Sequence, residues 1–425
     1  MENPWVKKSV SNFFTDCRDI FGDKSTFVGF EADESTTLRN QASQDGLNSI
    51  QLYGTIVYKD KNGNIRKSAA IMFKLTPKIK HSKFISYSFF NELNFYTKIV
   101  PVLSTLDKSF VSLFPQFFYG EMVFNVKEDK SVIILEDLKA KGYKMTEKKS
   151  FLDRAHLIIM MRKLGQFHAY SYKAKRDIPQ LFYPLANNCT ETNPLVNMEM
   201  CNFLPHLAQR GFQHLIQKDP SYRVYAPKIE SMLENVDDKC VEYLTGDVKN
   251  PNSVIIHGDY LRNNVMFQYE NNVPQDMIFM DLATYRFASP VIDLLTVLYL
   301  NTDQKIRDEL WDTLIDEYYE ALKSTFPKDK VPEKEEILGE FVDRAFYAYL
   351  IASHFLPILI ANDAADGATV SDARNFMKSG RHEMGFHELP KEVLIKAVLG
   401  KGGEAGTKAL SDVLQDIIDR GFICK

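Results

Sequence analysis

The sequence predicts an α+β protein of two unequal lobes, a small β-rich N-terminal lobe and a larger, mainly helical C-terminal lobe. Its length of 425 residues exceeds what one hydrophobic core usually organises. The first third contains strand-like segments, whereas from about Phe151 the apolar residues follow a helical period, apart from region 254–281. The polar stretch "KAKGYKMTEKK" separates the two parts. We therefore predict an N-lobe over residues 1–135, a hinge over 136–142 and a C-lobe over 143–425.

The expected N-lobe is a small antiparallel sheet with a helix packed on it. "SIQLYGTIVYKD" and "KSAAIMFKLTP" flank "KNGN", whose Asn62-Gly63 pair predicts a hairpin. "SYSFFNELNFYTKIVPVL" has apolar residues at helical spacing, and we expect Pro101 to end that helix. "SVIILEDL" is a further apolar strand. The N-terminal "MENPWVKKSVSNFFTDCRDIF" has the pattern of an amphipathic helix and lacks the continuous apolar region of a secretory signal.

Composition and charge narrow the class of protein. With 45% hydrophobic and 25% charged residues the chain has an ordinary globular composition. A net charge of -4 and no basic stripe argue against nucleic acid as a partner. The five cysteines are scattered without CxxC spacing, which suits reduced thiols and not structural zinc. We expect a cytoplasmic protein and infer no obligate protein partner.

Two further segments invite a functional interpretation. "AFYAYLIASHFLPILIA", Ala345 to Ala361, is short for a membrane span and contains a His and a Pro. We predict a buried core helix there, with the wall of an apolar ligand pocket as an alternative that is compatible with it. "GKGGEAGTK" is rich in Gly and Lys but lacks the GxxxxGK[ST] order of a phosphate-binding loop, so we predict a flexible connector.

A dense polar cluster interrupts two apolar runs in "IIHGDYLRNNVMF". Strand-like "SVII" leads into His257, Gly258 and Asp259, and strand-like "VMFQY" follows Asn264. "ENNVP" then turns the chain, and "MIFM" leads directly to Asp281. The pattern predicts a loop held at both ends, with a hairpin that returns a second carboxylate towards it.

These residue types and their spacing suit phosphoryl transfer to a hydroxyl. The attacking hydroxyl needs a proton acceptor, and the phosphoryl group needs cations that bridge its oxygens. Kinases use the Asp-x4-Asn spacing to place a base and a metal ligand on one loop, and a later Asp binds the other metal. Asp259 is then the catalytic candidate, and Asn264 and Asp281 are candidates for holding Mg²⁺, which prefers hard oxygen ligands.

Two other residues are expected to support this loop. A His two residues before the base braces such a loop more often than it reacts, so His257 is assigned support. Asp293, in "ASPVIDLLTVLYL", stands at a helix start, where capping or holding of the loop backbone is expected. The plain alternative for the whole pattern is a solvated turn rich in Asn and Asp, because short polar patterns recur by chance.

Nucleotide-binding parts are expected in the N-lobe. Lys74 in "IMFKLTP" lies between apolar neighbours, and Glu92 in "FFNELNFY" offers it a counter-charge; the alternative is two surface residues. The segment "NQASQDGLNS" would cover the phosphates, with Gly46 and Ser49 as candidates, although a glycine-rich loop would have several glycines. "IILEDL", with Glu136 and Leu138, would be the linker at the adenine edge or an exposed turn.

With these residues the chain resembles the ecdysteroid kinase-like family, a branch of the choline kinase and aminoglycoside phosphotransferase superfamily. The resemblance runs from roughly residue 42 to 300 and rests on "IMFKLTP", "FFNELNFYTKIVP", "LEDLKAKGY", "LGQFHAYS", "IIHGDYLRNNVMF" and "YRFASPVIDLL". It implies a bilobal protein-kinase-like fold that uses ATP and Mg²⁺ to phosphorylate a small-molecule alcohol. Ecdysteroids are the named substrate class of the family, and detoxification of dietary alcohols is also associated with it.

The chain departs from the family pattern in two places. Relatives often read Asp-Phe-Gln at the later metal-binding Asp, whereas this chain reads "MDLAT", with Leu282 and Ala283. The sparse glycine loop is the second departure. The leading hypothesis is therefore a small-molecule kinase with an apolar acceptor pocket in the helical lobe, where residues such as Phe346, Tyr349, Phe355 and Leu356 are plentiful.

Two alternatives remain open from the sequence. One is a catalytically weak or inactive kinase-fold protein that binds a hydrophobic ligand. The other, a protein kinase, lacks support because no APE-like segment follows Asp281.

Overall fold

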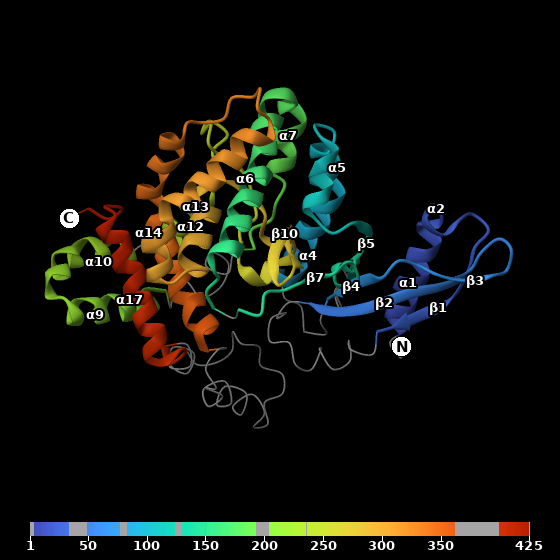
Figure 1. Cartoon of the computed structure of the whole chain (residues 1–425), viewed down its shortest axis with the longest axis horizontal. Coiled ribbons are helices and arrows are strands. Elements are labelled where there is room, and N and C mark those ends of the chain that lie inside the picture. Colours follow the sequence, from blue (N-terminus) through green and yellow to red (C-terminus); the bar gives the residue numbers. More distant parts are fainter. Residues whose placement is uncertain are drawn as a thin grey trace. The chain divides into compact units, whose positions relative to one another are not determined.

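The structure of the chain is a computed structural model in which the chain folds into two compact units. The structure describes residues 4–33, 49–76, 83–123, 130–148, 150–192, 204–234, 236–361 and 399–424. The first unit comprises Met1–Met145 and Val265–Ala283, and the second comprises Thr146–Asn264 and Thr284–Lys425. The predicted lobes were consecutive pieces of chain, whereas the hairpin over 265–283 groups with the first unit. Each unit is described separately below (Figure 1).

The first unit is built on an antiparallel sheet of six strands in the order β1-β2-β4-β6-β5, with β3 paired to β2. The strands are β1 (Thr26–Ala32), β2 (Ile50–Lys59), β3 (Ile65–Lys67), β4 (Ile71–Leu75), β5 (Phe117–Val123) and β6 (Lys130–Glu136). The hairpin predicted at Asn62-Gly63 is confirmed as β2–β3, and Gly63 has the positive φ of 81° that such a turn requires. Strand β1 was not predicted.

Helices cover both faces of strand β4. Its successive side chains point to opposite faces, so each face packs against a different helix. Ile71, Phe73 and Leu75 belong to a core cluster with Val10 and Phe13 of helix α1 (Pro4–Asp16), which is followed by α2 (Arg18–Phe21). On the other face Lys74 meets helix α4 (Lys83–Asn94). All five residues of β4 are therefore buried.

The helical run that begins with α4 does not end at Pro101, so that prediction is wrong. The π-helical turn η1 (Phe95–Ile99) follows α4, and α5 (Val100–Leu103) contains Pro101 in its first turn. A proline is tolerated there because the first N–H groups of a helical segment need no intrahelical acceptor. The 3₁₀ turn η2 (Lys108–Leu113) then leads to β5.

A second, small sheet in the first unit has the order β10-β9-β7. Its strands are β7 (Tyr143–Lys144), β9 (Val265–Glu270) and β10 (Val273–Phe279). Asn271 and Asn272 form the turn between β9 and β10 with φ of 50° and 64°, a conformation that Asn tolerates better than most residues. The hairpin that the sequence predicted before Asp281 is confirmed. The 3₁₀ turn η3 (Leu138–Lys141) lies between β6 and β7.

The second unit is mainly helical, as predicted. Its helices are α6 (Arg154–Asp177), α7 (Pro179–Ala186), α9 (Leu204–Lys218), α10 (Ala226–Glu234), α11 (Val236–Leu244), α12 (Val291–Leu300), α13 (Gln304–Thr325), α14 (Lys334–Ala361) and α17 (Gly403–Asp419), with the 3₁₀ turn η5 (Pro220–Tyr225). A two-stranded antiparallel pair, β8 (Val254–Ile256) and β11 (Arg286–Ala288), delivers the chain to the candidate site. The four cysteines that the structure describes are not joined in disulfides, and Cys201 lies outside the described residues.

Helix α14 is a core helix, as the apolar segment Ala345–Ala361 predicted. It packs against α9, α12 and α17. Phe346, Tyr349 and Leu356, which were expected near an acceptor pocket, are each at most 1% exposed and belong to this core. Among the described helices α14 is also long and apolar enough to cross a membrane, with 61% of its most apolar window buried, a property that core helices share.

The glycine-rich stretch near the C-terminus is not a connector, so that prediction is wrong. Helix α17 begins at Gly403, after Gly402 in the left-handed conformation (φ 69°), and it lies beside α14 (Figure 1). A Cβ at Gly402 would lie 2.8 Å from the carbonyl oxygen of Pro357. The close approach to α14 and the buried apolar face of α17 outweigh the low helix propensity of glycine.

Helices α6 and α13 pack along each other, and Gly165 permits their close approach. A Cβ at Gly165 would lie 2.3 Å from the carbonyl oxygen of Tyr318.

We expect Gly165→Ala to destabilise the protein by about 1–3 kcal/mol, because the backbones of α6 and α13 must separate. The matched control is Gly339→Ala in α14, where nothing lies within 4 Å of the added Cβ. That change should stabilise the helix by about 0.5–1 kcal/mol. Denaturation midpoints of the two variants decide the question, and equal shifts would refute the close-approach argument.

Candidate active site

In the first unit a buried lysine lies between two carboxylates. The Lys74 ammonium on β4 is 2.5 Å from Oε2 of Glu92 on α4 and 2.8 Å from Oδ1 of Asp281, two residues after β10. The Lys74 and Glu92 side chains are 8% and 2% exposed, whereas that of Asp281 is 48% exposed. The structure therefore brings together three of the predicted residues, which we call the Lys74 cluster.

The charges of the Lys74 cluster are strongly coupled. Burial lowers the pKa of Lys74, but the carboxylates of Asp281 and Glu92 more than offset this and hold the pKa above its ordinary value. Burial raises the pKa of the Glu92 carboxyl; Lys74 opposes this rise and Asp281 adds to it. Lys74 thus keeps its positive charge at neutral pH, and its charge favours the ionised form of the Glu92 carboxyl.

Helix α4 also fixes the backbone beyond Asp281. The fully buried Asn91, next to Glu92, donates from Nδ2 to the carbonyl oxygen of Ala283 at 3.0 Å. Asp281 itself has a φ of 56°, a left-handed conformation that is uncommon outside Gly, Asn and Asp. Leu282, which departs from the family pattern, is fully buried under this turn. The orientation of the Asp281 carboxylate is thus set by α4, by Lys74 and by the packing of Leu282.

In the second unit the residues 257–264, which we call the Asp259 loop, follow strand β8. Gly258 has a φ of 83°, and a Cβ at this position would lie 2.3 Å from the carbonyl oxygen of Thr284. The Thr284 hydroxyl also donates to the carbonyl oxygen of His257 at 3.1 Å. Only glycine fits this close approach of the two chain segments, which explains the "HGD" order.

The buried Asp293 of α12 holds the start of the Asp259 loop. Its Oδ2 accepts a hydrogen bond from the backbone N–H of His257 at 2.7 Å, and its Oδ1 accepts from that of Gly258 at 2.9 Å. Asp293 is fully buried, and His257 is too. Nδ1 of His257 accepts from the backbone N–H of Asp259 at 3.3 Å. Both residues thus contact the backbone of the loop.

Within the loop, Asn264 contacts Asp259 directly. Nδ2 of Asn264 donates to the backbone carbonyl of Asp259 at 2.7 Å and to its Oδ2 at 2.8 Å. Because both bonds use the amide nitrogen, the Asn264 Oδ1 is not used by Asp259; it accepts a long hydrogen bond from Nδ2 of Asn263 at 3.5 Å. Asp259 is partly exposed and Asn264 is 5% exposed. The five-residue spacing therefore brings the two side chains together.

Three of the four remaining predicted site residues, Ser49, Glu136 and Leu138, lie in the described part of the chain. Glu136 ends β6, and its Oε1 forms an ion pair with Lys141 at 2.5 Å. Leu138 is buried in a small cluster with Met266 and Ile278. Ser49 directly precedes β2 and is partly buried, and Gly46 lies outside the described residues.

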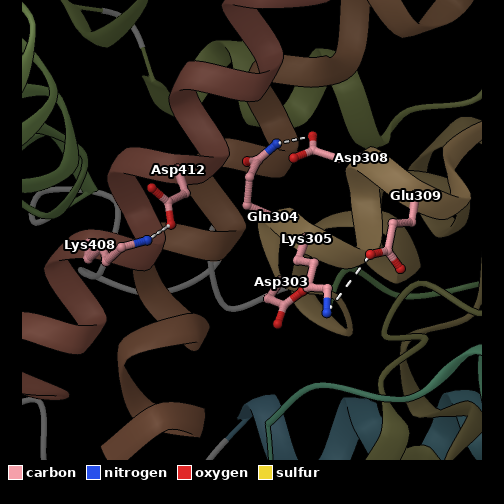
Figure 2. Close-up of a pocket in the computed structure, with 7 residues that line it drawn as sticks. All are labelled: Asp303, Gln304, Lys305, Asp308, Glu309, Lys408 and Asp412. Atoms are coloured by element: carbon pink, nitrogen blue, oxygen red, sulfur yellow. Dashed lines mark hydrogen bonds and ion pairs between the residues drawn. The ribbon is translucent and has the colours of Figure 1, made fainter.

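A surface hollow of about 490 Å³ in the second unit contains none of the predicted site residues. Figure 2 shows that its side chains come from the start of α13 and from α17 and that all of them except Asp303 pair with one another. The pairs are Lys408 with Asp412, Gln304 with Asp308 and Lys305 with Glu309. Surface side chains that mostly neutralise one another do not make this hollow a candidate site.

Sequence reasoning assigned no role to several residues that hold the site. Asn91 lies in "FFNELNFY", His168 in "LGQFHAYS" and Arg286 in "YRFASPVIDLL". Arg286 is 4% exposed and forms a bidentate pair with Glu191, at 2.7 and 2.9 Å, which ties residues 187–192 to β11. All three stand in stretches that carry the family resemblance, which was a usable signal.

The fold defines the class to which the chain belongs. An antiparallel sheet with a buried Lys–Glu pair in one unit, and a second unit that is mainly helical, are the α+β architecture of kinase-like proteins. The model of the ecdysteroid kinase-like family matches residues 45–330. This is more than half of the 425 residues, and the chain belongs to the ecdysteroid kinase-like family.

Solved structures similar to this chain are phosphotransferases of low sequence identity. They include the GDP complex of wild-type aminoglycoside 2'-phosphotransferase-IIIa, with 12% identity, a TM-score of 0.37 and coverage of 88% of this chain and 98% of that one. The AMP-bound complex of spectinomycin phosphotransferase has 9% identity, a TM-score of 0.34 and coverage of 93% and 98%. An aminoglycoside phosphotransferase from Streptomyces rimosus, in complex with ADP and streptomycin, has 12% identity, a TM-score of 0.30 and coverage of 81% and 97%. A search of curated proteins found no match.

The Lys74 cluster makes a pH-dependent prediction. In Lys74→Met the Glu92 carboxyl loses the cation that lowers its pKa, so its folded-state pKa rises further above the unfolded value. A raised carboxyl pKa contributes stability at low pH that is lost as pH rises through the folded pKa. As pH rises from about 5 to 8, we therefore expect the free energy of unfolding of Lys74→Met to fall by about 1–3 kcal/mol more than that of the wild type.

Denaturation midpoints measured across this pH range test the prediction. The double variant Lys74→Met/Glu92→Gln should remove the added slope, because no ionisable carboxyl remains on α4 at this point. Lys67→Met is the control, since Lys67 pairs with Glu31 on the surface. Parallel pH profiles for Lys74→Met and the wild type would contradict the coupling.

Proposed function

We propose that this chain is an ATP-dependent small-molecule kinase that transfers the γ-phosphoryl group to the hydroxyl of an alcohol. The observation that carries the proposal is the buried Lys74 ammonium held by Glu92 and Asp281. A buried lysine with a fixed charge is costly for stability alone, and a kinase uses this arrangement to bind nucleotide phosphates. The family to which the chain belongs supports the same chemistry.

The residues of the Lys74 cluster would divide the nucleotide-binding work. Lys74 supplies a positive charge to the phosphate oxygens of ATP, and Glu92 orients that charge. The half-exposed Asp281 keeps a carboxylate accessible from solvent while one oxygen contacts Lys74. Ser49 and the segment that contains Gly46 precede β2 in the chain, and we propose that they cover the phosphates, with the linker at Glu136 and Leu138 beside the adenine.

Each of the two proposed metal ligands suits magnesium by its own chemistry. Asn264 has an Oδ1 whose one described contact is a long hydrogen bond from Asn263, and Asp281 has a half-exposed carboxylate. Both are hard oxygen ligands, which Mg²⁺ prefers. Asn264 is the residue before β9 and Asp281 lies two residues after the paired strand β10, so one hairpin connects them in the chain. Magnesium bound by these oxygens would neutralise charge on the transferring phosphoryl group.

Asp259 is the proposed acceptor or orienting group for the substrate hydroxyl. Its Oδ2 accepts from Asn264, and its backbone is fixed at both ends by Asn264 and by the His257 side chain. A carboxylate held in one orientation can position a hydroxyl for attack and take up its proton as the new P–O bond forms and the bond to the leaving ADP breaks.

The acceptor is proposed to be an ecdysteroid or another apolar metabolite or xenobiotic, with detoxification as one setting in the cytoplasm. The support is the family, whose named substrate class is steroidal. Of the apolar residues that the sequence suggested for a pocket, Phe355 is partly exposed, whereas Phe346, Tyr349 and Leu356 are core residues. The acceptor-binding residues are therefore to be sought elsewhere than in the middle of α14.

The test is a search for phosphoryl transfer. Incubated with ATP and Mg²⁺, the wild type is expected to add one phosphate to an alcohol from a library of steroids, plant phenolics and glycosides, seen as a mass gain. Asp259→Asn should lower kcat about 10²–10⁴-fold, because positioning and proton acceptance are lost. Asp312→Asn, an exposed carboxyl on α13, is the control and should leave the rate unchanged. Binding of ATP and apolar ligands without product would favour the alternative, a kinase-fold protein that binds a hydrophobic ligand.

The magnesium assignment has its own test, with an exposed polar residue as the control. Asn264→Ala should raise the Mg²⁺ concentration for half-maximal rate by about tenfold or more, because a metal ligand and its contact with Asp259 are lost together. Gln268→Ala, whose side chain is exposed on β9, should change that concentration less than about twofold. Titration of Mg²⁺ at saturating ATP gives both values. An equal requirement for Mg²⁺ in the two variants would remove Asn264 from the metal site.

A further inference from the structure

A buried histidine on α6 contacts the residue that holds the Asp259 loop. His168 is fully buried, and its two ring nitrogens face different elements of the second unit. Nδ1 lies 3.0 Å from the hydroxyl oxygen of Tyr318 on α13, and Nε2 lies 3.4 Å from Oδ2 of Asp293 on α12. The ring therefore links α13 to α12 at the carboxylate that binds the loop backbone.

The Tyr318 hydroxyl determines which nitrogen of His168 carries the proton. Burial raises the pKa of Tyr318 well above its ordinary value, so the phenol keeps its proton. Burial also lowers the pKa of His168, against the opposing effect of Asp293, so the ring is neutral and has one N–H. The Tyr318 hydroxyl lies 3.0 Å from His168 Nδ1, and the carboxylate of Asp293 on the other side of the ring favours a proton on Nε2, which leaves Nδ1 to accept from the phenol. If Nδ1 accepts, the single ring proton resides on Nε2 and points towards Asp293.

The contact of His168 with Asp293 is electrostatic at nearly hydrogen-bond distance. At 3.4 Å the Nε2–Oδ2 separation is longer than a normal N–H···O bond and does not meet its geometry. Asp293 is nevertheless fully buried and carries two strong bonds from the backbone amides of His257 and Gly258. A buried carboxylate is stabilised by the positive partial charges around it. A proton on Nε2 of His168 therefore favours the charged form of Asp293, whereas a lone pair on Nε2 would oppose it.

The helix packing fixes this pair in place. Gly165 lies one turn before His168 on α6, and its missing side chain lets the backbone of α13 approach at Tyr318 itself. The His168 and Tyr318 rings meet edge to face, with centroids 5.7 Å apart at 76°. The hydroxyl of Tyr318 is thus delivered to Nδ1 by the same close crossing.

We propose that His168 and Tyr318 form a positioning pair for phosphoryl transfer. Tyr318 selects the Nε2–H form of His168, this N–H stabilises the charged Asp293, and Asp293 holds the backbone of the Asp259 loop. Neither residue contacts the reacting atoms in this scheme. The inference rests on the proposed function for its effect on rate, whereas its structural steps can be measured without turnover.

The first measurement reads the proton position. Long-range ¹⁵N NMR of histidine-labelled protein should show His168 as the Nε2–H tautomer in the wild type. In Tyr318→Phe the signal should move towards a mixture of tautomers, because Nδ1 has lost its donor. Tyr319→Phe is the matched control, since the Tyr319 hydroxyl on the same helix donates to the carbonyl of Pro332 instead. An Nδ1–H tautomer in the wild type would overturn the proposal.

The second measurement reads the loop. Amide hydrogen exchange at His257 and Gly258 should accelerate about tenfold in His168→Leu, since Asp293 loses a stabilising donor. His168→Gln, whose amide can place an N–H near the position of Nε2, should restore most of the protection. Exchange unchanged in His168→Leu, or equal in the Leu and Gln variants, would contradict the role of the N–H.

Kinetics then separate positioning from general stability. With an acceptor in hand, Tyr318→Phe should lower kcat by about tenfold and change KM for ATP by less than about twofold, because the loop and not the nucleotide contact is affected. Equal rates in Tyr318→Phe and Tyr319→Phe would overturn the positioning role. If the wild type transfers no phosphoryl group while the NMR and exchange results hold, the proposed function fails and the His168–Asp293 linkage stands.

Discussion

The ion pairs of the buried Lys74 ammonium are the constraint on which the candidate site depends. A buried charge is tolerated only when its partners are close and correctly oriented, and Lys74 meets one carboxylate from α4 and one that follows β10. Three segments of the first unit, distant in sequence, are thereby fixed at one point. Asn91 adds a second link between α4 and the turn after Asp281. The position of α4 and the position of the Asp281 carboxylate are consequently not independent, and a displacement of one exposes charge at the other.

The second unit also contains a buried charge near the candidate site, and this charge is negative. Asp293 is a buried anion, and its partners are two backbone amides in place of a side-chain cation. Amide dipoles compensate a carboxylate without adding an ionisable group, so the charge of Asp293 is stabilised while the conformation of His257 and Gly258 is set. Asn264 does the same further along the loop by donating twice to Asp259. Asp259, the proposed catalytic residue, is thus left partly exposed, whereas Asp293 and Asn264, which hold the loop, are buried.

Residues were predictable where a local rule had one physical explanation. A lysine inside an apolar strand is costly unless paired, which indicated Lys74 and Glu92, and the Asp-x4-Asn spacing brought Asp259 next to Asn264. The missed features depend on tertiary packing. Helix α17 begins among glycines because its close approach to Pro357 requires them, and the helical run passes Pro101 because a π-helical turn precedes it. The role of His168 depends on neighbours from α12 and α13, which no spacing along α6 reveals.

The backbone of Asp281 gives an independent reason to assign this residue a function. Its φ of 56° is conformationally less favourable for Asp than for Gly, and half of its side chain is exposed. Neither backbone conformation nor core packing therefore favours an Asp at this position. The surrounding structure nevertheless holds it there through Asn91, Lys74 and the buried Leu282. A strained residue that is held this firmly, with half of its side chain exposed beside its ion pair with Lys74, is a reason to propose that the free part of the carboxylate binds a ligand. The cation-binding role proposed for Asp281 explains why a carboxylate occupies a position that glycine would fill at lower conformational cost.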